Sequence, residues 1–161
     1  MNPATPGTRR EPPREQTLPE EIANAVTHGL GLLLSVGCLA TGVIFAARYS
    51  TTTIITSVAV HGATLCLLYL SSTLYHSLPP GRAKHVWNLF DHASIYLLIA
   101  GTYTPITLAL ATRQPVWGWG LFGVIWGLAL LGIVFQACFL HRFRALSTLT
   151  YLAMGWLVLI A

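Results

Sequence analysis

Five long stretches of the chain contain no Asp, Glu, Lys or Arg, and short polar segments separate them. The uncharged stretches are residues 22–47, 49–81, 92–112, 114–141 and 145–161. A helix needs about 20 apolar residues to cross the hydrocarbon core of a bilayer, which is roughly 30 Å thick. The first four stretches reach this length, and the fifth is slightly shorter. The pattern therefore predicts an all-α, polytopic bundle of transmembrane helices.

The hydrophobic stretches predict five helices joined by short connections. We expect the helices at residues 25–46, 54–75, 93–111, 116–140 and 146–161. The connections are polar and too short to hold a folded domain outside the membrane. Any functional site is therefore expected within the membrane or at its surface.

The composition supports a membrane protein and excludes other classes. Hydrophobic residues make up 54% of the 161 residues and charged residues 9%, whereas a soluble domain carries roughly 25% charged residues. The chain has too little charge to cover a surface that faces water. The net charge of +4 does not indicate a nucleic-acid partner, because the nine Lys and Arg residues lie in small groups and form no basic stripe.

The basic residues are distributed unevenly between the two sides of the predicted bundle. One side would carry Arg9, Arg10, Arg14, Arg82, Lys84, Arg142 and Arg144, and the other side would carry Arg48 and Arg113. Cytoplasmic segments of membrane proteins are enriched in Lys and Arg, so this bias predicts a cytoplasmic N-terminus. We expect a multi-pass protein of the cell inner membrane.

Residues 1–19 differ in composition from the rest of the chain. They contain five of the nine prolines and three arginines, which is typical of disordered segments. They contain no apolar stretch of the kind found in a signal peptide. We expect a disordered cytoplasmic tail over residues 1–19 and a transmembrane domain over residues 20–161.

Polar residues gather at the predicted cytoplasmic ends of the first three helices. They are Glu21, Asn24 and His28 on one face of the first helix, Ser72 and His76 on one face of the second, and Asp91 at the start of the third. Residues three, four or seven positions apart share a helix face. Membrane proteins retain such groups mostly where they face a cavity, a partner or an ion. Their common depth predicts a functional site.

Each of these residues also has a simpler explanation. Glu21 lies in the first helical turn, where the helix dipole favours a carboxylate, and Asp91 would serve as a plain helix cap. Ser72 would bond a backbone carbonyl four residues earlier, and His76 would be an interfacial histidine. The site hypothesis rests on the coincidence of all of them at one depth on three helices.

Several segments resemble the motifs of a known family. Residues 20–29 (EEIANAVTHG), 71–76 (SSTLYH), 90–92 (FDH) and 95–105 (IYLLIAGTYTP) resemble the hemolysin III branch of the progestin and adipoQ receptor family, and residues 146–156 resemble its fifth helix. The resemblance extends over about residues 18–161. It implies a bundle of seven transmembrane helices, of which five are present here.

The resemblance also implies a zinc ion buried near the cytoplasmic side. The ligands in the family are a histidine that matches His76 and two histidines of an H-x-x-x-H motif in the seventh helix. An aspartate that matches Asp91 holds a zinc-bound water, and a serine that matches Ser72 lies nearby. Glu21, Asn24 and His28 would form a supporting polar face. Membrane lipid is the expected partner, possible also as substrate.

The chain departs from the family pattern because it stops within the fifth helix, so two of the implied histidine ligands have no counterpart. A catalytic zinc site usually supplies three protein ligands. We expect either a fragment of a longer protein or a truncated chain with an incomplete metal site. The absence of a polar tail after Ala161 favours a fragment.

Several functions are consistent with these residues. The first is a zinc-dependent intramembrane hydrolase of a lipid amide, which the resemblance to alkaline ceramidases favours, with Asp91 as general base and Ser72 as a hydrogen-bond donor. The alternatives are a pore-forming hemolysin and a membrane signalling receptor. A metal-free serine hydrolase that uses Ser72, His76 and Asp91 is a further option, although the glycine-flanked nucleophile elbow is absent.

Overall fold

A computed structural model of the chain describes residues 16–139 and 144–157. In these residues the chain forms five helices and no strands. The helices are α1 (Leu18–Tyr49), α2 (Thr52–Ser77), α3 (Arg82–Arg113), α4 (Pro115–Phe139) and α5 (Arg144–Trp156). The all-α fold predicted from the hydrophobic stretches is confirmed.

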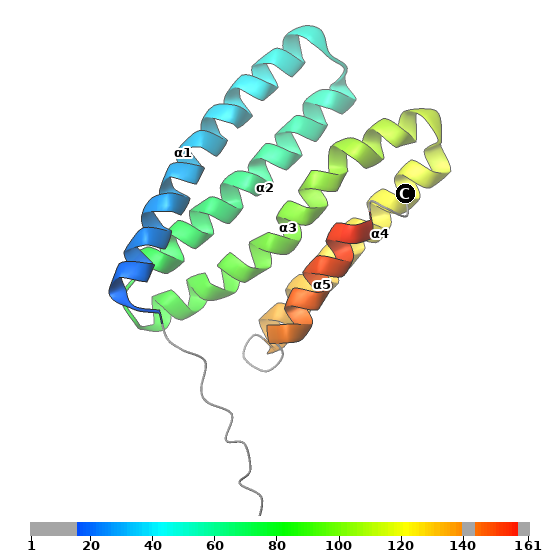
Figure 1. Cartoon of the computed structure of the whole chain (residues 1–161). Helices are drawn as coiled ribbons and strands as arrows, with labels where there is room; N and C mark the ends of the chain where they lie inside the picture. Colours follow the sequence, from blue (N-terminus) through cyan, green and yellow to red (C-terminus); the bar gives the residue numbers. More distant parts are fainter. Residues whose placement is uncertain (1–15, 140–143, 158–161) are drawn as a thin grey trace, which may run out of the picture.

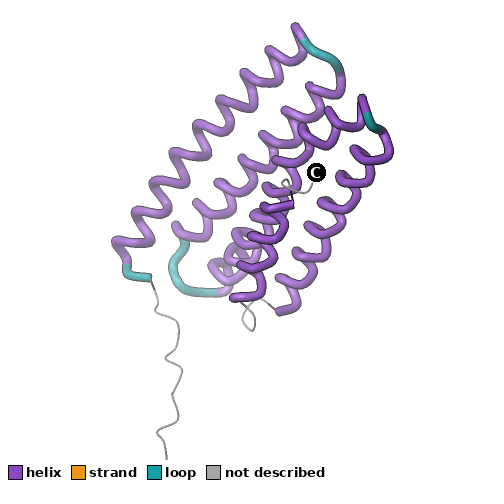
Figure 2. The backbone as a smooth tube through the Cα atoms, turned by 45° about the vertical axis from the view of Figure 1, so that its right-hand side comes forward, coloured by secondary structure: helices purple, strands orange, loops and turns teal. Residues whose placement is uncertain are grey.

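Consecutive helices run antiparallel, and short turns join α1 to α2, α2 to α3 and α3 to α4 (Figure 1). The first four helices pack in chain order, α1 on α2, α2 on α3 and α3 on α4. Helix α5 folds back onto α3 and α4 (Figure 2). This topology places the beginning of α1, the end of α2 and the beginning of α3 at one end of the bundle.

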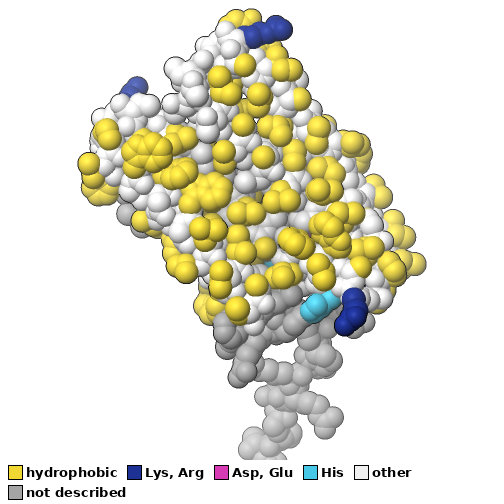
Figure 3. Space-filling model, turned by 180° about the vertical axis from the view of Figure 1, so that it is seen from behind, with side chains coloured by type: hydrophobic (Ala, Val, Ile, Leu, Met, Phe, Trp, Pro, Cys, Tyr) yellow, Lys and Arg dark blue, Asp and Glu magenta, His cyan; other side chains and the backbone are white. Residues whose placement is uncertain are grey.

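Four helices, α1 to α4, are long and apolar enough to cross a membrane. Many of their large hydrophobic side chains are exposed. On the face drawn in Figure 3, hydrophobic side chains cover the middle of the molecule and basic side chains lie at its ends. Such a surface is suited to lipid rather than water. The described part of α5 has 13 residues, which is shorter than a membrane span.

Two helices, α1 and α3, begin earlier than predicted, and the earlier start of α3 changes the site. Helix α1 begins at Leu18, so it includes two residues that were assigned to the tail; residues 1–15 lie outside the described part of the chain. The Thr17 backbone N–H and hydroxyl both donate to the Glu20 carboxylate, at 2.7 and 2.9 Å. This contact explains the earlier start, because it provides a partner for the polar groups at the helix end.

Helix α3 begins at Arg82, eleven residues before the predicted position. Asp91 therefore lies inside the helix and does not open it. The boundary was predicted from charge, but Arg, Lys and Ala are good helix formers. A helix of 32 residues is about 48 Å long and extends beyond a hydrocarbon core of roughly 30 Å. Its charged first turns can thus remain outside the hydrocarbon.

The described core lies between α3, α4 and α5. It is formed by Tyr96, Ala100, Tyr103, Ile125, Ala129 and Met154. Buried threonine hydroxyls in α3 bond to carbonyls of their own helix: Thr104 donates to Ala100 and Thr107 to Tyr103. Such bonds allow polar side chains to pack among apolar ones without an unsatisfied donor.

Glycines set how closely the helices approach. A Cβ atom on Gly31 would lie 2.6 Å from the Tyr69 ring, and one on Gly62 would lie 2.5 Å from the Leu39 side chain. These positions bring α1 and α2 together with little space between them, as small residues do in membrane helix pairs. The axial position of α1 against α2 is what aligns the polar residues at the end of the bundle.

Candidate functional site

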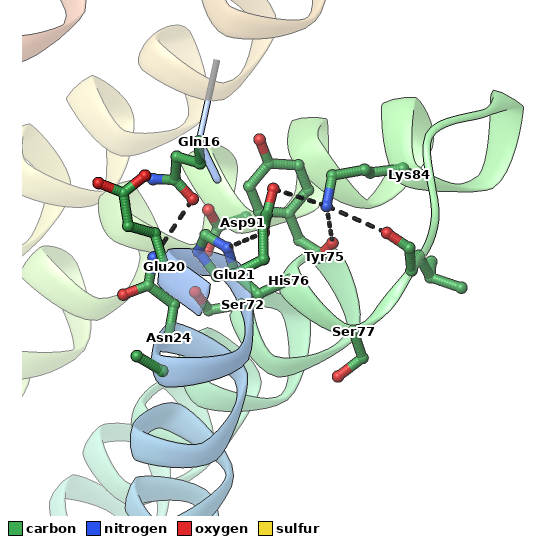
Figure 4. A network of polar contacts seen from close by, with 12 residues as sticks. Gln16, Glu20, Glu21, Asn24, Ser72, Tyr75, His76, Ser77, Lys84 and Asp91 are labelled. Atoms are coloured by element: carbon green, nitrogen blue, oxygen red, sulfur yellow. Dashed lines mark hydrogen bonds and ion pairs between the residues drawn. The ribbon is translucent and has the colours of Figure 1, made fainter. Parts of the chain in front are cut away.

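An ionic cluster joins the first three helices at the end of the bundle where α1 begins. His76 in the last turn of α2 lies 2.7 Å from Glu21 in the first turn of α1, measured from Nδ1 to Oε2. The Lys84 ammonium of α3 lies 2.9 Å from Oε1 of the same carboxylate. Figure 4 shows the three side chains directed toward one another. They are largely buried, with 8% of His76, 17% of Glu21 and 16% of Lys84 exposed.

Lys84 is held by α2 as well as by Glu21. Its ammonium donates to the carbonyls of Tyr75 and Leu78 at 3.1 Å each, and it lies 4.8 Å from the centre of the Tyr75 ring. The last carbonyls of a helix have no partner within the helix and attract a cation. Lys84 therefore provides a hydrogen-bond partner for carbonyls at the end of α2 and balances the negative charge of Glu21.

A second pair lies beside this cluster. The His28 Nδ1 atom of α1 is 2.6 Å from the buried Ser72 hydroxyl of α2. The His28 ring packs edge-on against the His76 ring, with centroids 5.8 Å apart, and against Tyr69 at 5.9 Å. The two predicted site residues of α2 thus have their partners on α1: Ser72 bonds to His28, and His76 bonds to Glu21.

This pairing differs from the one considered for a serine hydrolase. Ser72 and His76 share a helix face, but each is bonded across to α1 and not to the other. Among the described residues, the Asp91 carboxylate has a charge contact with His92 at 3.9 Å and no hydrogen bond to Ser72 or His76. The serine triad of Ser72, His76 and Asp91 is therefore not assembled in this structure.

The remaining predicted site residues lie at the same end of the bundle (Figure 4). Asp91 is on α3 and is about four-fifths buried, with 18% of its side chain exposed. Its backbone carbonyl accepts a bond from Ser94, which also bonds to Ser71 of α2 at 3.0 Å. Asn24 bonds to Gln16 at 3.3 Å, away from Ser72 and His76.

Comparison with known proteins places the chain among membrane proteins of one kind. The family described as "Haemolysin-III related" matches residues 16–161. The chain belongs to this family. It is 49% identical over 145 residues to a "Hemolysin-3 homolog" of Bacillus subtilis (strain 168), a match that covers 90% of this chain and 67% of the relative. It is 45% identical over 146 residues to "Hemolysin-3" of Bacillus cereus, covering 91% of this chain and 66% of the relative.

The matched region spans about two thirds of the length of these relatives. No solved structure matches the chain at a significant level. The comparisons confirm the resemblance to hemolysin III proteins that the motifs in α1, α2 and α3 indicated. They support a multi-pass membrane protein of that family, together with the four long apolar helices.

The zinc site that the family resemblance implies stays a prediction. Within residues 16–139 and 144–157, no three His, Cys, Asp or Glu side chains form a group that could hold a metal ion. A catalytic zinc site usually takes three ligands from the protein. His76 would supply one, and its Nδ1 atom is already bonded to Glu21.

Lys84 contacts Glu21 in the site of this hemolysin III-related chain, but its sequence pattern did not predict that role. It was counted only as a basic residue of a connecting segment, because residues 77–92 carried no long apolar stretch. A signal was nevertheless present: the tight Pro79-Pro80-Gly81 turn and the helix formers after it favour a helix that begins near Arg82. A helix starting there places Lys84 in its first turn, beside the end of α2.

Proposed function

We propose that this hemolysin III-related chain carries the cytoplasmic part of a zinc-dependent intramembrane hydrolase that cleaves the amide bond of a lipid. The observation that supports it is the group of buried or half-buried polar residues in α1, α2 and α3, joined by contacts of 2.6 to 2.9 Å. Ionisable residues inside a membrane bundle are costly and are retained mostly for function. A lipid amide is a substrate that can reach such a site from the bilayer.

The residues of this chain have distinct roles in the proposal. His76 is the metal ligand that this chain contributes, and the other two are those implied by the resemblance for a seventh helix. Ser72, oriented by His28, donates a hydrogen bond to the substrate carbonyl. Asp91 accepts a proton from the attacking water, whose oxygen joins the acyl carbon as the carbon–nitrogen bond breaks and the amine leaves with a proton.

Hydrolysis of a lipid amide tests this function. A longer protein is needed, made by joining this chain to the part of the Bacillus subtilis relative that lies beyond the match. In liposomes that contain a fluorescent ceramide-type amide and zinc, we expect release of the fatty acid. Asp91→Ala is expected to lower the rate by about 10²- to 10⁴-fold, the usual contribution of a general base.

Thr112→Ala is the matched control for this experiment, because Thr112 lies on the same helix as Asp91 but near its other end, and its hydroxyl bonds to the Ala109 carbonyl of that helix. It should leave the rate within a few-fold of the parent protein. Absence of hydrolysis in a zinc-loaded protein that is correctly folded contradicts the proposal, as does equal loss in Thr112→Ala and Asp91→Ala.

The names of the relatives favour a second candidate function, a membrane pore. The relatives from Bacillus are named as a hemolysin and a hemolysin homolog, and a pore is one way in which such an activity would arise. Release of a small dye from liposomes measures this activity without any assumption about the site. Rapid dye release that is unaffected by Ser72→Ala and His76→Ala, with no amide hydrolysis, would favour the pore over the hydrolase.

The proposal places the ionic cluster on the cytoplasmic side of the inner membrane. Of the described basic residues, Arg82 and Lys84 lie at the end of the bundle that carries the site, and Arg48 and Arg113 lie at the other end. The counts in the whole chain, seven against two, favour cytoplasmic placement of the site.

Cysteine labelling tests this orientation. In a variant whose three native cysteines are replaced, Gln114→Cys is expected to react with a membrane-impermeant reagent added to spheroplasts. Arg82→Cys should react only after the membrane is opened. If only the Arg82→Cys variant is labelled from the outside, the orientation of the protein in the membrane is the opposite of the one proposed.

A further inference from the structure

We propose that Glu21 is a positioning residue that fixes the His76 ring with its proton on Nδ1 and leaves Nε2 free to bind a ligand. Lys84 in turn fixes Glu21. The proposal rests on the proposed function only in taking His76 as the residue that binds the metal or substrate. It assigns to α1 and α3 the task of orienting a side chain on α2.

The first step concerns the hydrogen bond between Glu21 and His76. An ionised carboxylate can only accept hydrogen bonds, and a neutral imidazole carries one N–H donor and one acceptor nitrogen. With Glu21 ionised, a hydrogen bond of 2.7 Å between Nδ1 and Oε2 requires the proton to lie on Nδ1. The Nε2 atom then carries the lone pair, which is the form of histidine that binds a metal ion.

The second step concerns the state of the Glu21 carboxylate. Its two oxygens have different partners, Oε2 with His76 and Oε1 with Lys84 at 2.9 Å. A cation this close to a largely buried carboxylate favours its ionised form. Lys84 therefore supplies a positive charge that balances Glu21.

The third step concerns rigidity. The Lys84 ammonium also bonds to the Tyr75 and Leu78 carbonyls at the end of α2. Those carbonyls belong to residues on either side of His76 in the sequence. The Lys84 ammonium is therefore fixed relative to the backbone that carries His76. The α2 backbone thus holds Lys84, Lys84 holds Glu21, and Glu21 holds the His76 ring, which is itself on α2. These contacts leave the ring little freedom to flip.

Metal-binding histidines in other proteins have a similar hydrogen bond. Such histidines usually donate their second ring N–H to a carboxylate or carbonyl, which fixes the tautomer and the ring orientation. His28 holds Ser72 in the same way from the same face of α1, at 2.6 Å. Helix α1 thus holds both polar residues that α2 contributes to the site.

The tautomer of His76 can be measured directly in the 161-residue chain. The protein is labelled with ¹⁵N-histidine in detergent micelles and studied in mildly alkaline buffer, where a neutral ring carries one proton. The His76→Gln variant assigns the signals among the six histidines. We expect Nδ1 to be protonated and Nε2 unprotonated in the parent chain. A parent chain with the proton mainly on Nε2 overturns the proposal without any variant.

Three variants separate positioning from a structural role. Glu21→Ala is expected to convert the single tautomer into a mixture, because the acceptor for Nδ1–H is lost. Glu21→Gln keeps a side-chain oxygen as acceptor and should retain the Nδ1–H form. Glu20→Ala removes the neighbouring carboxylate, which contacts Thr17 at the start of α1, and should leave the His76 signals unchanged.

An unchanged tautomer in a folded Glu21→Ala protein would contradict the proposal, and so would an equal change in Glu20→Ala. The test is independent of catalysis. A positive tautomer result together with absent amide hydrolysis would refute the proposed function and leave the positioning role of Glu21 intact. The reverse outcome would keep the function and refute the positioning role.

Discussion

The 161-residue chain is expected to retain far less than one zinc ion per molecule, and the same chain joined to the remaining third of the Bacillus subtilis relative is expected to retain about one. The reason lies in the number of ligands. His76 would supply one metal ligand, and the described residues contain no group of three metal-binding side chains. A single ligand leaves most of the coordination of the ion to solvent, and little offsets the cost of holding a divalent ion near a membrane.

In the longer protein, the two residues of the site should respond differently to substitution. His76→Ala is expected to remove the zinc, because it takes away a direct ligand. Asp91→Ala should leave most of the metal bound, because the aspartate is expected to hold water and not the ion. Elemental analysis of the detergent-purified proteins measures both effects. Stoichiometric zinc in the 161-residue chain that persists in His76→Ala would mean that the ligand has been assigned wrongly.

Gly118→Ala is expected to destabilise the bundle, whereas Gly120→Ala is expected to be neutral or slightly stabilising. Both glycines lie in α4, two residues apart. A Cβ atom on Gly118 would overlap with the backbone of Ala111 in α3, whereas one on Gly120 has no atom of another element within 4 Å. A backbone atom cannot rotate away as a side chain can, so the two helices must separate.

The expected cost of Gly118→Ala is about 1–3 kcal/mol, the usual range for overpacking. Gly120→Ala gains up to about 1 kcal/mol from helix propensity. Unfolding in mixed detergent, followed by tryptophan fluorescence, compares the two proteins. The turn between α3 and α4 makes the contact unavoidable, because Gln114 alone separates the helices. Equal stability of the two variants would show that α3 and α4 do not approach as closely as described.

The positions of the first four membrane spans could be predicted from the sequence. The reason is physical: a bilayer excludes charge, so each span appears as an uncharged stretch of about 20 residues. The same rule misplaced the start of α3, because it identifies the part of a helix that lies in lipid and not the part that continues beyond it. Residues 82–91 are helical although they include the charged side chains of Arg82, Lys84 and Asp91.

The helical period also predicted which polar residues share a face. Glu21 and His28 lie on one side of α1, and Ser72 and His76 on one side of α2, as their spacing requires. The structure brings these four residues together at one end of the bundle. That much follows from spacing within a helix and from the antiparallel path of two consecutive helices.

Only the tertiary structure decided which residue bonds to which. Ser72 is bonded to His28 and not to His76, and the charge that balances Glu21 comes from Lys84 on α3. These pairings depend on how far each helix is rotated and shifted along its neighbour. Rotation and shift are set by close contacts such as Gly31 against Tyr69 and Gly62 against Leu39, which no periodicity within a single helix encodes.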